Sequence, residues 1–429
     1  MSRRRDRRDF LKQSALAGAG FWAAAGAAPA ESRSANEKLN VALIGCGGRG
    51  ASNLSGVKKE NIVALCDVDG RRAKGAFEAY DRAAKYQDFR VMLDKQKDIQ
   101  AVVVSTPDHL HAPATLAALN CGKPVYCEKP LTHTVGEARR VIETANRLGL
   151  PTQMGTQIHA GENYRRVVEI VQAGVLGPIR ECHVWVGKNW GGGERPKETP
   201  VVPAEVNWDL WLGPAAYRPY HSIYMPKNWR RWWDFGTGTL GDMACHYMDL
   251  PFWALKLRHP TRVESQGAAV HPETCPVGLT VRYEFPEREG FPALKLIWRD
   301  GNQIPKKLFG QKVPGSGVMF IGERGRMLAG YSSYKLLPES EFEGFKPPEK
   351  TIERSVGHHQ EWINACKTGS ATTCNFDYSG TLTEAVLLGD VAYRVGQPLK
   401  WNAKKLTADD CPQADKFINK TYRNGWALG

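Results

Sequence analysis

The sequence predicts an α/β protein: an N-terminal doubly wound parallel sheet followed by an α+β domain with an open, mostly antiparallel sheet. Apolar, β-rich runs alternate with helical patterns through residues 38–157, which is typical of a parallel sheet with crossover helices. Residues 261–330 instead alternate polar and apolar positions between turn signals, which indicates the strands of an open sheet. The second domain is predicted at residues 158–400, with a C-terminal tail at 401–429.

The first 30 residues have the three-part layout of a cleaved export signal. A basic segment with Arg7 and Arg8 precedes the apolar stretch "ALAGAGFWAAAGAA" (15–28) and the small residues "APA". This stretch is too short and too rich in Ala and Gly for a membrane span. "RRDFLK" resembles the twin-arginine signal, so we expect export to the periplasm, a linker at 31–37 and no stable membrane span after processing. A basic amphipathic tail or a retained anchor is the alternative.

Charge and cysteine content exclude several function classes. The 429-residue chain has a formal net charge of +13, and residues 1–30 hold six basic and two acidic residues. The mature chain would keep about +9 without a dense Lys/Arg block, which argues against nucleic-acid binding. The ten cysteines form no C-x-x-C pair, so we predict buried thiols and no disulfide framework. No carboxylate/His cluster has the spacing of a metal site.

The first predicted strand, "VALIG" (41–45), ends in a glycine-rich turn. Gly45, Gly47 and Gly50 form a G-x-G-x-x-G pattern between this strand and a helix-compatible stretch. The first two glycines let the backbone turn and approach a pyrophosphate, and the third lets the helix pack on the strand. The helix N-terminus adds amide donors and a favourable dipole for an anion. These features predict a Rossmann dinucleotide-binding domain.

Asp67 follows the second predicted strand, about 20 residues beyond Gly45. An acidic side chain there accepts hydrogen bonds from ribose hydroxyls and repels a 2′-phosphate, so NAD is the predicted cofactor. Arg71 and Arg72 follow closely and leave NADP as the alternative. The structural alternative for Asp67 is a helix N-cap or turn residue.

Two further turns, "STPDHLH" (105–111) and "CEKPLTH" (127–133), follow the next two predicted strands. Ligands of parallel sheets lie at the carboxyl ends of strands, so both turns belong to the predicted site. The cofactor candidates in them are Thr106, Pro107, His111, Glu128 and Lys129.

The nonapeptide "GDMACHYMD" (241–249) is the main candidate for acid-base chemistry. Asp242 and His246 are one helical turn apart on one face, so the carboxylate can help fix the position and charge of the imidazole. Histidine has a pKa suited to proton transfer near neutrality. The alternative is a packing helix with a few buried polar groups, and Asp249 either contacts substrate or anchors the helix end.

Taken in order, these motifs resemble the glucose-fructose oxidoreductase, inositol dehydrogenase and rhizopine-catabolism (Gfo/Idh/MocA) family. The matching strings are "GCGGRG", "TPDHLH", "CEKPL", "GVLGPIRE" and "GDMACHYMD", spread over residues 38–400. The resemblance implies that Lys129, Asp242 and His246 form a catalytic group beside the nicotinamide. It also implies a homo-oligomer that associates through the second-domain sheet, which the long loops 186–233 and 331–356 would alter.

Seven of the thirteen tryptophans lie between residues 185 and 233, interspersed with Tyr, His and Arg. Aromatic faces beside hydrogen-bonding groups suit sugar rings, whereas packing or a subunit interface is the alternative. The predicted substrate-binding residues are Trp190, Tyr224, Arg230, Trp232, Trp233 and Asp249.

Two helices are predicted near the end of the chain, at 358–369 and 381–396. The second is expected to pack back on the first domain. His358 and His359 begin the first of them, where they either reach the cleft or face solvent.

Together these features predict an exported NAD(P)-dependent oxidoreductase that takes a hydride from a sugar, glycoside or cyclitol hydroxyl and holds its cofactor tightly. The first alternative is a redox-neutral glycosidase, lyase or epimerase that works through a transient ketone. The second is a secreted sugar-binding protein without turnover. Lys129 favours the oxidoreductase, because the redox-neutral relatives implied by the resemblance lack this lysine.

Overall fold

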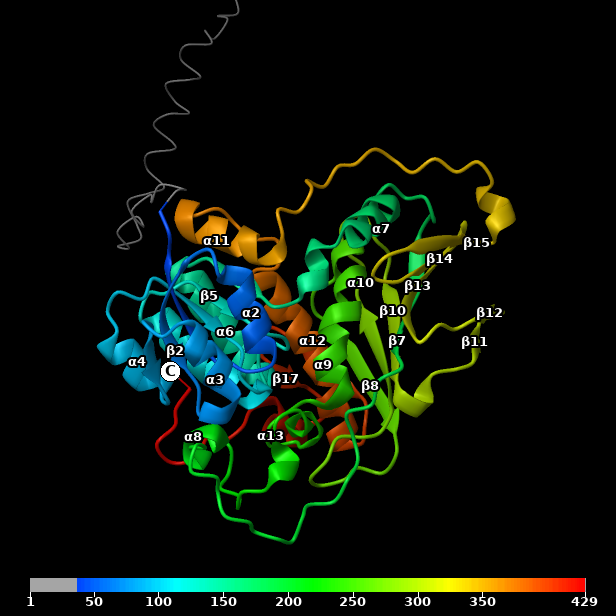
Figure 1. Cartoon of the computed structure of the whole chain (residues 1–429). Coiled ribbons are helices and arrows are strands. Elements are labelled where there is room, and N and C mark those ends of the chain that lie inside the picture. Colours follow the sequence, from blue (N-terminus) through cyan, green and yellow to red (C-terminus); the bar gives the residue numbers. More distant parts are fainter. Residues whose placement is uncertain (1–36, 429) are drawn as a thin grey trace, which may run out of the picture. The chain divides into compact units, whose positions relative to one another are not determined.

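The computed structural model describes residues 37–428 (Figure 1). The expected signal peptide and nearly all of the expected linker lie outside the described residues. No helix within residues 37–428 is long and apolar enough to cross a membrane. All ten cysteines are free thiols, and eight of them are buried.

The N-terminal sheet has six parallel strands in the order β3-β2-β1-β4-β5-β6, which confirms the doubly wound prediction. Its central strands are buried on both faces, as their continuous apolar sequences require. The strands are β1 (Asn40–Ile44), β2 (Asn61–Cys66), β3 (Ala84–Tyr86), β4 (Ala101–Val104), β5 (Val125–Cys127) and β6 (Thr152–Met154).

Crossover helices connect these strands: α2 (Arg49–Val57), α3 (Gly70–Ala79), α4 (Phe89–Lys95), α5 (His111–Asn120) and α6 (Val135–Leu148). The residues at both ends of α6 explain where this helix begins and ends. Thr134 and Glu137 form a reciprocal capping box at its N-terminus, and Gly149 ends it in a left-handed conformation with φ 62°.

The second sheet has nine strands in the order β15-β14-β13-β7-β10-β9-β8-β16-β17. Only β7 and β10 pair in parallel, so the prediction of an open, mostly antiparallel sheet is confirmed. The strands are β7 (Ile179–Val186), β8 (Arg262–Gly267), β9 (Leu279–Phe285), β10 (Leu294–Asp300), β13 (Ser316–Gly322), β14 (Gly325–Ala329), β15 (Tyr334–Leu337), β16 (Leu399–Asn402) and β17 (Thr407–Ala408). A separate hairpin joins β11 (Lys307–Leu308) to β12 (Gln311–Lys312).

Helices α9 (Gly238–Tyr247), α10 (Asp249–Ala254) and α12 (Phe376–Val395) lie between the two sheets (Figure 1). Helix α12 contacts α6 and β6 on one side and β8 on the other. It begins at Phe376 rather than at the expected residue 381, because the Asn375 side chain accepts a hydrogen bond from the Tyr378 amide and caps it. The remaining helices are α7 (Glu162–Gln172), α8 (Trp208–Leu212), α11 (His358–Thr368) and α13 (Asp415–Ile418).

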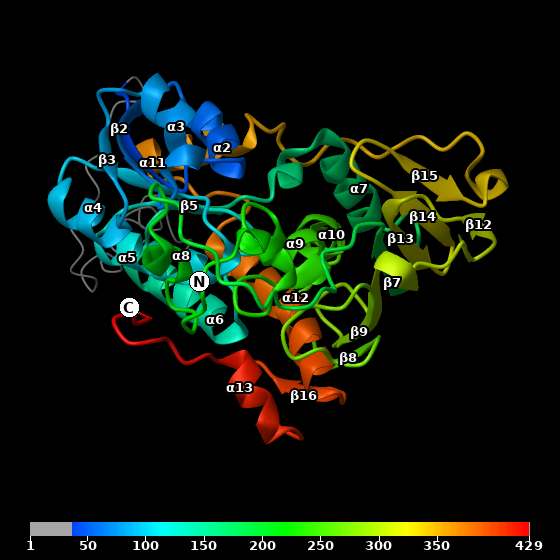
Figure 2. The ribbon, with the colours of Figure 1, turned by 60° about the horizontal axis from the view of Figure 1, so that its bottom comes forward.

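The segment 401–429, expected as a tail, contributes to the second domain instead. Strands β16 and β17 extend the nine-stranded sheet, and α13 packs against α12 (Figure 2). Trp401, Ala408 and Ile418 are buried there, which explains why this stretch is ordered against the sheet.

Candidate active site

A cavity of about 980 Å³ lies at the carboxyl ends of the parallel strands and is lined by both domains. Most of the predicted site residues meet in its wall, although they come from distant parts of the sequence. Those residues are Gly45, Gly47, Asp67, Thr106, Pro107, His111, Glu128, Lys129, Trp190, Arg230, Asp242 and His246.

The glycine-rich turn has the geometry that close backbone approach requires. Gly45 has φ +85°, and a Cβ atom on Gly50 would lie 2.0 Å from the Gly45 carbonyl oxygen. Gly50 therefore lies behind the turn and is absent from the cavity wall, while Gly45 and Gly47 line it. Helix α2 begins directly after Gly48 without a side-chain cap, so its first amides are available to an anion.

Asp67 lies at the next strand end and lines the cavity. Its carboxylate accepts hydrogen bonds from the amides of Cys46 (2.8 Å) and Asp69 (3.0 Å), while burial raises its pKa. The N-cap of α3 is Asp69, which accepts from the amides of Arg71 and Arg72. Asp67 is therefore a turn-bound carboxylate on the cavity wall and not the helix cap.

The end of the cavity near Asp67 is covered by two segments remote in sequence, residues 205–212 and 423–426, which we call the cover. The amide of Asn207 donates to the Val68 carbonyl oxygen at 2.8 Å, and Arg423 donates to Asp209 at 2.6 Å. Trp426 receives the Arg90 guanidinium over its ring at 4.3 Å and lines the cavity. The C-terminal segment lies beside α4 (Figure 1), where the rings of Phe89 and Trp426 are in contact.

Lys129, Asp242 and Arg230 form a hydrogen-bonded cluster on the opposite part of the wall. The Lys129 Nζ atom donates to the Asp242 main-chain oxygen (2.6 Å) and to Asp242 Oδ1 (2.5 Å), and Arg230 Nε donates to the same Oδ1 at 2.8 Å. Burial alone would raise the pKa of Asp242, but the two cations outweigh burial and hold that pKa well below its usual range. Asp242 is therefore ionised and fixes both cations.

His246 lies on the same helical face but does not pair with Asp242. Its Nδ1 atom is buried without a hydrogen-bond partner among the described residues. Burial, followed by the charge of Lys129, lowers the pKa of His246 to about 3. The expected carboxylate–imidazole pair is thus replaced by a carboxylate–lysine pair, because Lys129 and Arg230 occupy Asp242. The imidazole is therefore neutral at pH 7, and its pKa lies below the near-neutral value expected from the sequence, because it is buried beside Lys129 rather than paired with Asp242.

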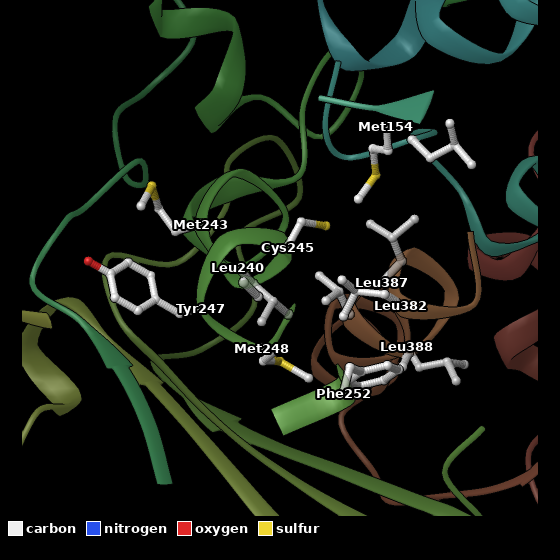
Figure 3. Close-up of a cluster of buried hydrophobic side chains, with 14 of the residues drawn as sticks. Met154, Leu240, Met243, Cys245, Tyr247, Met248, Phe252, Leu382, Leu387 and Leu388 are labelled. Atoms are coloured by element: carbon white, nitrogen blue, oxygen red, sulfur yellow. The ribbon is translucent and has the colours of Figure 1, made fainter. Parts of the chain in front are cut away.

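The opposite face of α9 explains why these polar groups face the cavity. Leu240, Cys245 and Met248 point toward apolar side chains of α12, including Leu382 and Leu387 (Figure 3). Because this face is anchored in the core, the residues on the other side of α9 are presented to the cavity.

A second polar network, around Glu128, was not predicted from the sequence. Its Oε1 atom accepts from Arg49 Nε (3.0 Å), Asn53 Nδ2 (2.9 Å) and Gln157 Nε2 (2.9 Å). Burial would raise the pKa of Glu128, yet Arg49 and Asn53 lower it, so the group is a carboxylate. The network joins the first turn of α2 to the turn after β5.

The histidines expected near the site have separate places in the structure. His111 lies 2.7 Å from the Pro130 oxygen and 2.9 Å from the Thr106 oxygen, so it ties the two predicted turns together. His358 is buried, with Nε2 2.7 Å from the Met154 oxygen, while His359 Nε2 lies 3.0 Å from Asn53 Oδ1. His111 lines the cavity itself, whereas of His358 and His359 only His359 contacts the Glu128 network, through Asn53.

Three of the predicted aromatic substrate residues do not line the cavity. Tyr224 and Trp232 belong to a buried aromatic cluster in which their ring centroids are 5.2 Å apart. Trp233 packs in the main core, and its Nε1 atom donates to the His271 oxygen at 3.1 Å. At these three positions, the aromatic residues of the segment therefore form part of the core and not of the cavity wall.

Asp249 is also absent from the cavity wall. It is fully buried, 3.0 Å from His159 Nδ1, and accepts a hydrogen bond from the Tyr378 hydroxyl at 2.7 Å. These contacts anchor the start of α10 to α12, which corrects the prediction of substrate binding.

The aromatic residues that do line the cavity include four that the sequence did not single out. These are Trp211, Trp229, Tyr247 and Tyr331. The Tyr247 and Tyr331 rings stack at 4.5 Å, and the Arg230 guanidinium lies 4.3 Å from the Trp229 ring centroid. Tyr331 comes from the turn after β14, and a turn has no helix or strand periodicity from which its place could be predicted.

In the part of the chain that the structure describes, no group of His, Cys, Asp and Glu is arranged to hold a metal ion.

Two family models match the chain and cover nearly all of residues 37–428. The model described as "Oxidoreductase family, NAD-binding Rossmann fold" matches residues 39–156. The model described as "Oxidoreductase family, C-terminal alpha/beta domain" matches residues 161–428.

Similar curated proteins include two inositol 2-dehydrogenases. That of Salmonella typhimurium is 30% identical over 202 residues, which are 44% of this chain and 59% of the relative. That of Rubrobacter xylanophilus is 35% identical over 150 residues, 34% of this chain and 43% of the relative. The matches span about half the length of these relatives.

Similar solved structures include the WlbA dehydrogenase from Bordetella pertussis in complex with NADH and UDP-GlcNAcA, with a TM-score of 0.60 and 17% identity over 85% of this chain and 99% of that one. The aldose-aldose oxidoreductase from Caulobacter crescentus complexed with glycerol gives a TM-score of 0.56 and 16% identity over 85% of this chain and 100% of that one. At these identities the likeness shows the fold. Since the C-terminal model alone matches more than half of its length, the chain belongs to the Gfo/Idh/MocA oxidoreductase family, and its first domain is an NAD-binding Rossmann domain.

Proposed function

We propose that this protein is an exported NAD-dependent oxidoreductase that oxidises a hydroxyl of a sugar or cyclitol and retains its cofactor between turnovers. One observation carries the proposal: the buried Lys129–Asp242–Arg230 cluster lies beside the neutral imidazole of His246 in the wall of the dinucleotide cavity. Oxidation of an alcohol needs a proton acceptor next to a group that stabilises negative oxygen, and these residues supply both.

The residues of the first domain fit NAD. Gly45, Gly47 and the uncapped α2 N-terminus suit the pyrophosphate, and Asp67 suits the ribose hydroxyls. Bound there, NAD supplies the hydride acceptor.

The chain's own residues then handle the proton. Lys129, oriented by Asp242, donates a hydrogen bond to the substrate hydroxyl and stabilises negative charge as it develops on that oxygen. His246 accepts the hydroxyl proton at a ring nitrogen, since its imidazole is neutral and its Nδ1 atom has no partner among the described residues. Arg230 neutralises Asp242 from the other side and keeps the carboxylate in place.

Cofactor retention is supported by the cover. Residues 205–212 and 423–426 close the Asp67 end of the cavity, where the adenosine would lie. They bond to the first domain through Asn207 and Gly425 and to each other through Arg423 and Asp209. Release of the adenosine would require these contacts to break, which slows dissociation. Retention would suit an enzyme exported by the signal expected at residues 1–30, because no pool of soluble NAD exists outside the cytoplasm.

The substrate class is supported by the aromatic wall and by the relatives. Trp190, Trp229 and the stacked Tyr247–Tyr331 pair line the cavity close to Arg230 and His246. Such surfaces suit the C–H faces and hydroxyls of sugar and cyclitol rings. The inositol 2-dehydrogenases among the relatives point to the same class. We also infer that the protein is a homo-oligomer, as the family resemblance implies.

The test is the spectrum of the protein as purified from an exporting host. We expect nicotinamide absorbance before any cofactor is added, and a reduced-cofactor band when the right free sugar or cyclitol is supplied. A panel of sugars, glycosides and inositols identifies the substrate.

Products formed without a reduced band would instead favour the redox-neutral glycosidase, lyase or epimerase. Bound sugar without either signal would favour a sugar-binding protein. Absence of bound nicotinamide would contradict cofactor retention, and it would leave the hydride-transfer proposal to be tested with added NAD.

A further inference from the structure

A second cavity, of about 210 Å³, lies between α12, α13, the start of α6 and the loops around Ala215 and Gly236. Figure 2 shows α13 beside α12 on this side of the molecule. It shares no lining residue with the catalytic cavity. The two are separated by Thr237, which lines the second cavity and donates a 2.7 Å hydrogen bond to Asp108 in the wall of the first.

Arg394 brings to this second cavity a guanidinium that has no ion pair within residues 37–428. Its guanidinium carbon lies 4.8 Å from the Trp233 ring centroid and 4.2 Å from that of Phe417, and both residues also line the cavity. These rings offer no hydrogen-bond acceptor in their planes, and Arg394 makes no hydrogen bond or ion pair with any residue of 37–428. The Arg394 side chain is half-buried, and a guanidinium in such a place commonly pairs with an anion that accepts from its fork of N–H donors.

Asp390 lies one helical turn before Arg394 and lines the same cavity. It is only 8% exposed, and its Oδ2 atom has no hydrogen-bond partner in the described part of the chain. Asp and Arg at this spacing on a helix commonly form an ion pair, but these two do not. Burial raises the pKa of Asp390 well above its usual value, so the carboxyl can donate to a ligand as well as accept.

The other charged groups around the cavity are already paired or face solvent. Asp234 forms an ion pair with Arg218, and Lys420 lies 2.8 Å from Glu137 Oε1. Lys416 is exposed. The unmet hydrogen-bonding capacity of the cavity therefore comes from Arg394 and Asp390.

The rest of the wall is partly apolar, which restricts the ligand further. Pro214, Ala215, Leu387 and Val391 line the cavity and would contact carbon atoms. A bare inorganic anion would leave this side without a partner. A polyol without charge would leave the guanidinium of Arg394 unpaired.

We propose that this cavity is a second ligand site that binds a small organic hydroxy acid, whose carboxylate pairs with Arg394 and whose hydroxyl bonds Asp390. A planar carboxylate can accept two parallel hydrogen bonds from a guanidinium. A hydroxyl can donate to Asp390 and accept from it, so it suits the carboxyl in either protonation state. The site lies directly behind Gly236 and Thr237, which lead into the helix that carries Asp242 and His246.

The experiment is titration calorimetry on the full-length, NAD-saturated protein at pH 7 with four probes: lactate, propionate, glycerol and orthophosphate. We expect one equivalent of lactate to bind, propionate to bind more weakly, and glycerol and orthophosphate to give no signal at the same concentrations. Arg394→Gln should weaken lactate binding by about tenfold or more, and Arg394→Lys, which keeps the charge but loses the planar fork, by less. Asp390→Ala should remove the preference for lactate over propionate.

Two variants control for binding elsewhere. Arg258→Gln removes an exposed guanidinium that pairs with Asp377, and Arg230→Gln removes, of the three arginines that line the catalytic cavity, the one in the Lys129–Asp242 cluster. Both should retain lactate binding. Loss of binding in Arg230→Gln would assign the acid to the catalytic cavity and overturn the proposal.

The remaining outcomes are also decisive. Three results would each overturn the second site. The first is an unchanged lactate affinity in a folded Arg394→Gln protein, and the second is stronger binding of orthophosphate than of lactate. The third is a lactate-soaked crystal that holds only water in this cavity. Since no turnover is measured, failure of this site leaves the proposed oxidoreductase activity untouched, and the reverse also holds.

Discussion

Replacement of Asp242 by Asn tests whether this carboxylate organises the candidate active site. Asn preserves shape and one acceptor oxygen but removes the charge that Lys129 Nζ and Arg230 Nε contact at 2.5 and 2.8 Å. Hydrogen bonds to charged groups contribute about 1.5–3 kcal/mol each and neutral ones about 0.5–1.5 kcal/mol. Converting the two bonds should therefore lower the free energy of unfolding by about 2–3 kcal/mol.

The same substitution should reduce turnover, because Lys129 loses the carboxylate that orients it. We expect kcat to fall by about two orders of magnitude while bound NAD is retained, since Asp242 makes no contact with the glycine-rich turn or Asp67. The pH dependence has a defined sign. The folded-state pKa of Asp242 is lowered, so its stabilisation is present above the unfolded-state pKa of about 4 and is lost as the pH falls further.

Urea unfolding of wild type and Asp242→Asn between pH 3 and pH 8, together with steady-state rates, measures both effects. The matched control is Asp377→Asn, which removes a half-exposed ion pair with Arg258 and should cost less than about 1 kcal/mol. The reasoning is refuted if Asp242→Asn matches this control in stability and retains wild-type turnover. A stability gap that widens below pH 4 would contradict the assignment of an ionised Asp242.

Three further predictions concern the cofactor turn, the imidazole and the cover. Gly50→Ala should abolish NAD binding, because its Cβ would meet the Gly45 oxygen at 2.0 Å. The control, Gly75→Ala, has open space around it in α3 and should stabilise that helix by about 0.5–1 kcal/mol. Calorimetric NAD titration measures the first effect and thermal melts the second. His246→Gln should abolish turnover with NAD still bound, and near-full activity would remove the imidazole from the mechanism. The folded-state pKa of His246 is about 3, so below pH 6.5 the unfolded chain binds a proton that the folded protein does not. This group should therefore lower the free energy of unfolding by up to about 1.4 kcal/mol per pH unit between pH 6.5 and pH 3. A urea midpoint gap between wild type and His246→Gln that stays constant over this pH range would contradict the low pKa. Trp426→Ala should speed NAD release in a stopped-flow chase, and an unchanged release rate would contradict the role of the cover.

The parallel sheet and its cofactor turn could be predicted because their signals are local. Residues 41–44, 62–66 and 101–104 are continuous apolar runs, and a strand of a parallel sheet covered on both faces needs such a run whatever packs against it. The role of Gly50 also follows from local geometry, since a strand–turn–helix unit brings its position against Gly45. Lys129, Asp242 and His246 were expected together because the ordered motifs resemble those of the family, whereas helix geometry alone relates only Asp242 and His246.

The partners of those residues could not be predicted. Asp242 and His246 are adjacent on one helical turn, so helix geometry alone pairs them. The tertiary structure brings Lys129 and Arg230 to Asp242 instead, and two fixed cations compete for a carboxylate more strongly than a neutral imidazole. Asp249 shows the same limit, because its burial beside His159 depends on how α10 meets α12.

The aromatic residues between 185 and 233 show what the sequence determines and what only the tertiary structure decides. Composition places Trp and Tyr densely in residues 185–233, but the same side chains serve a core and a binding wall equally well. Only the path of the chain over the first domain decides that Trp190 and Trp229 line the cavity while Trp232 and Trp233 pack behind it. The sequence by itself determined the two sheets, the dinucleotide turn and the chemical groups of the site. The tertiary structure alone decided which group faces which, because these contacts join different segments of the chain, as Lys129 and Asp242 do across 113 positions.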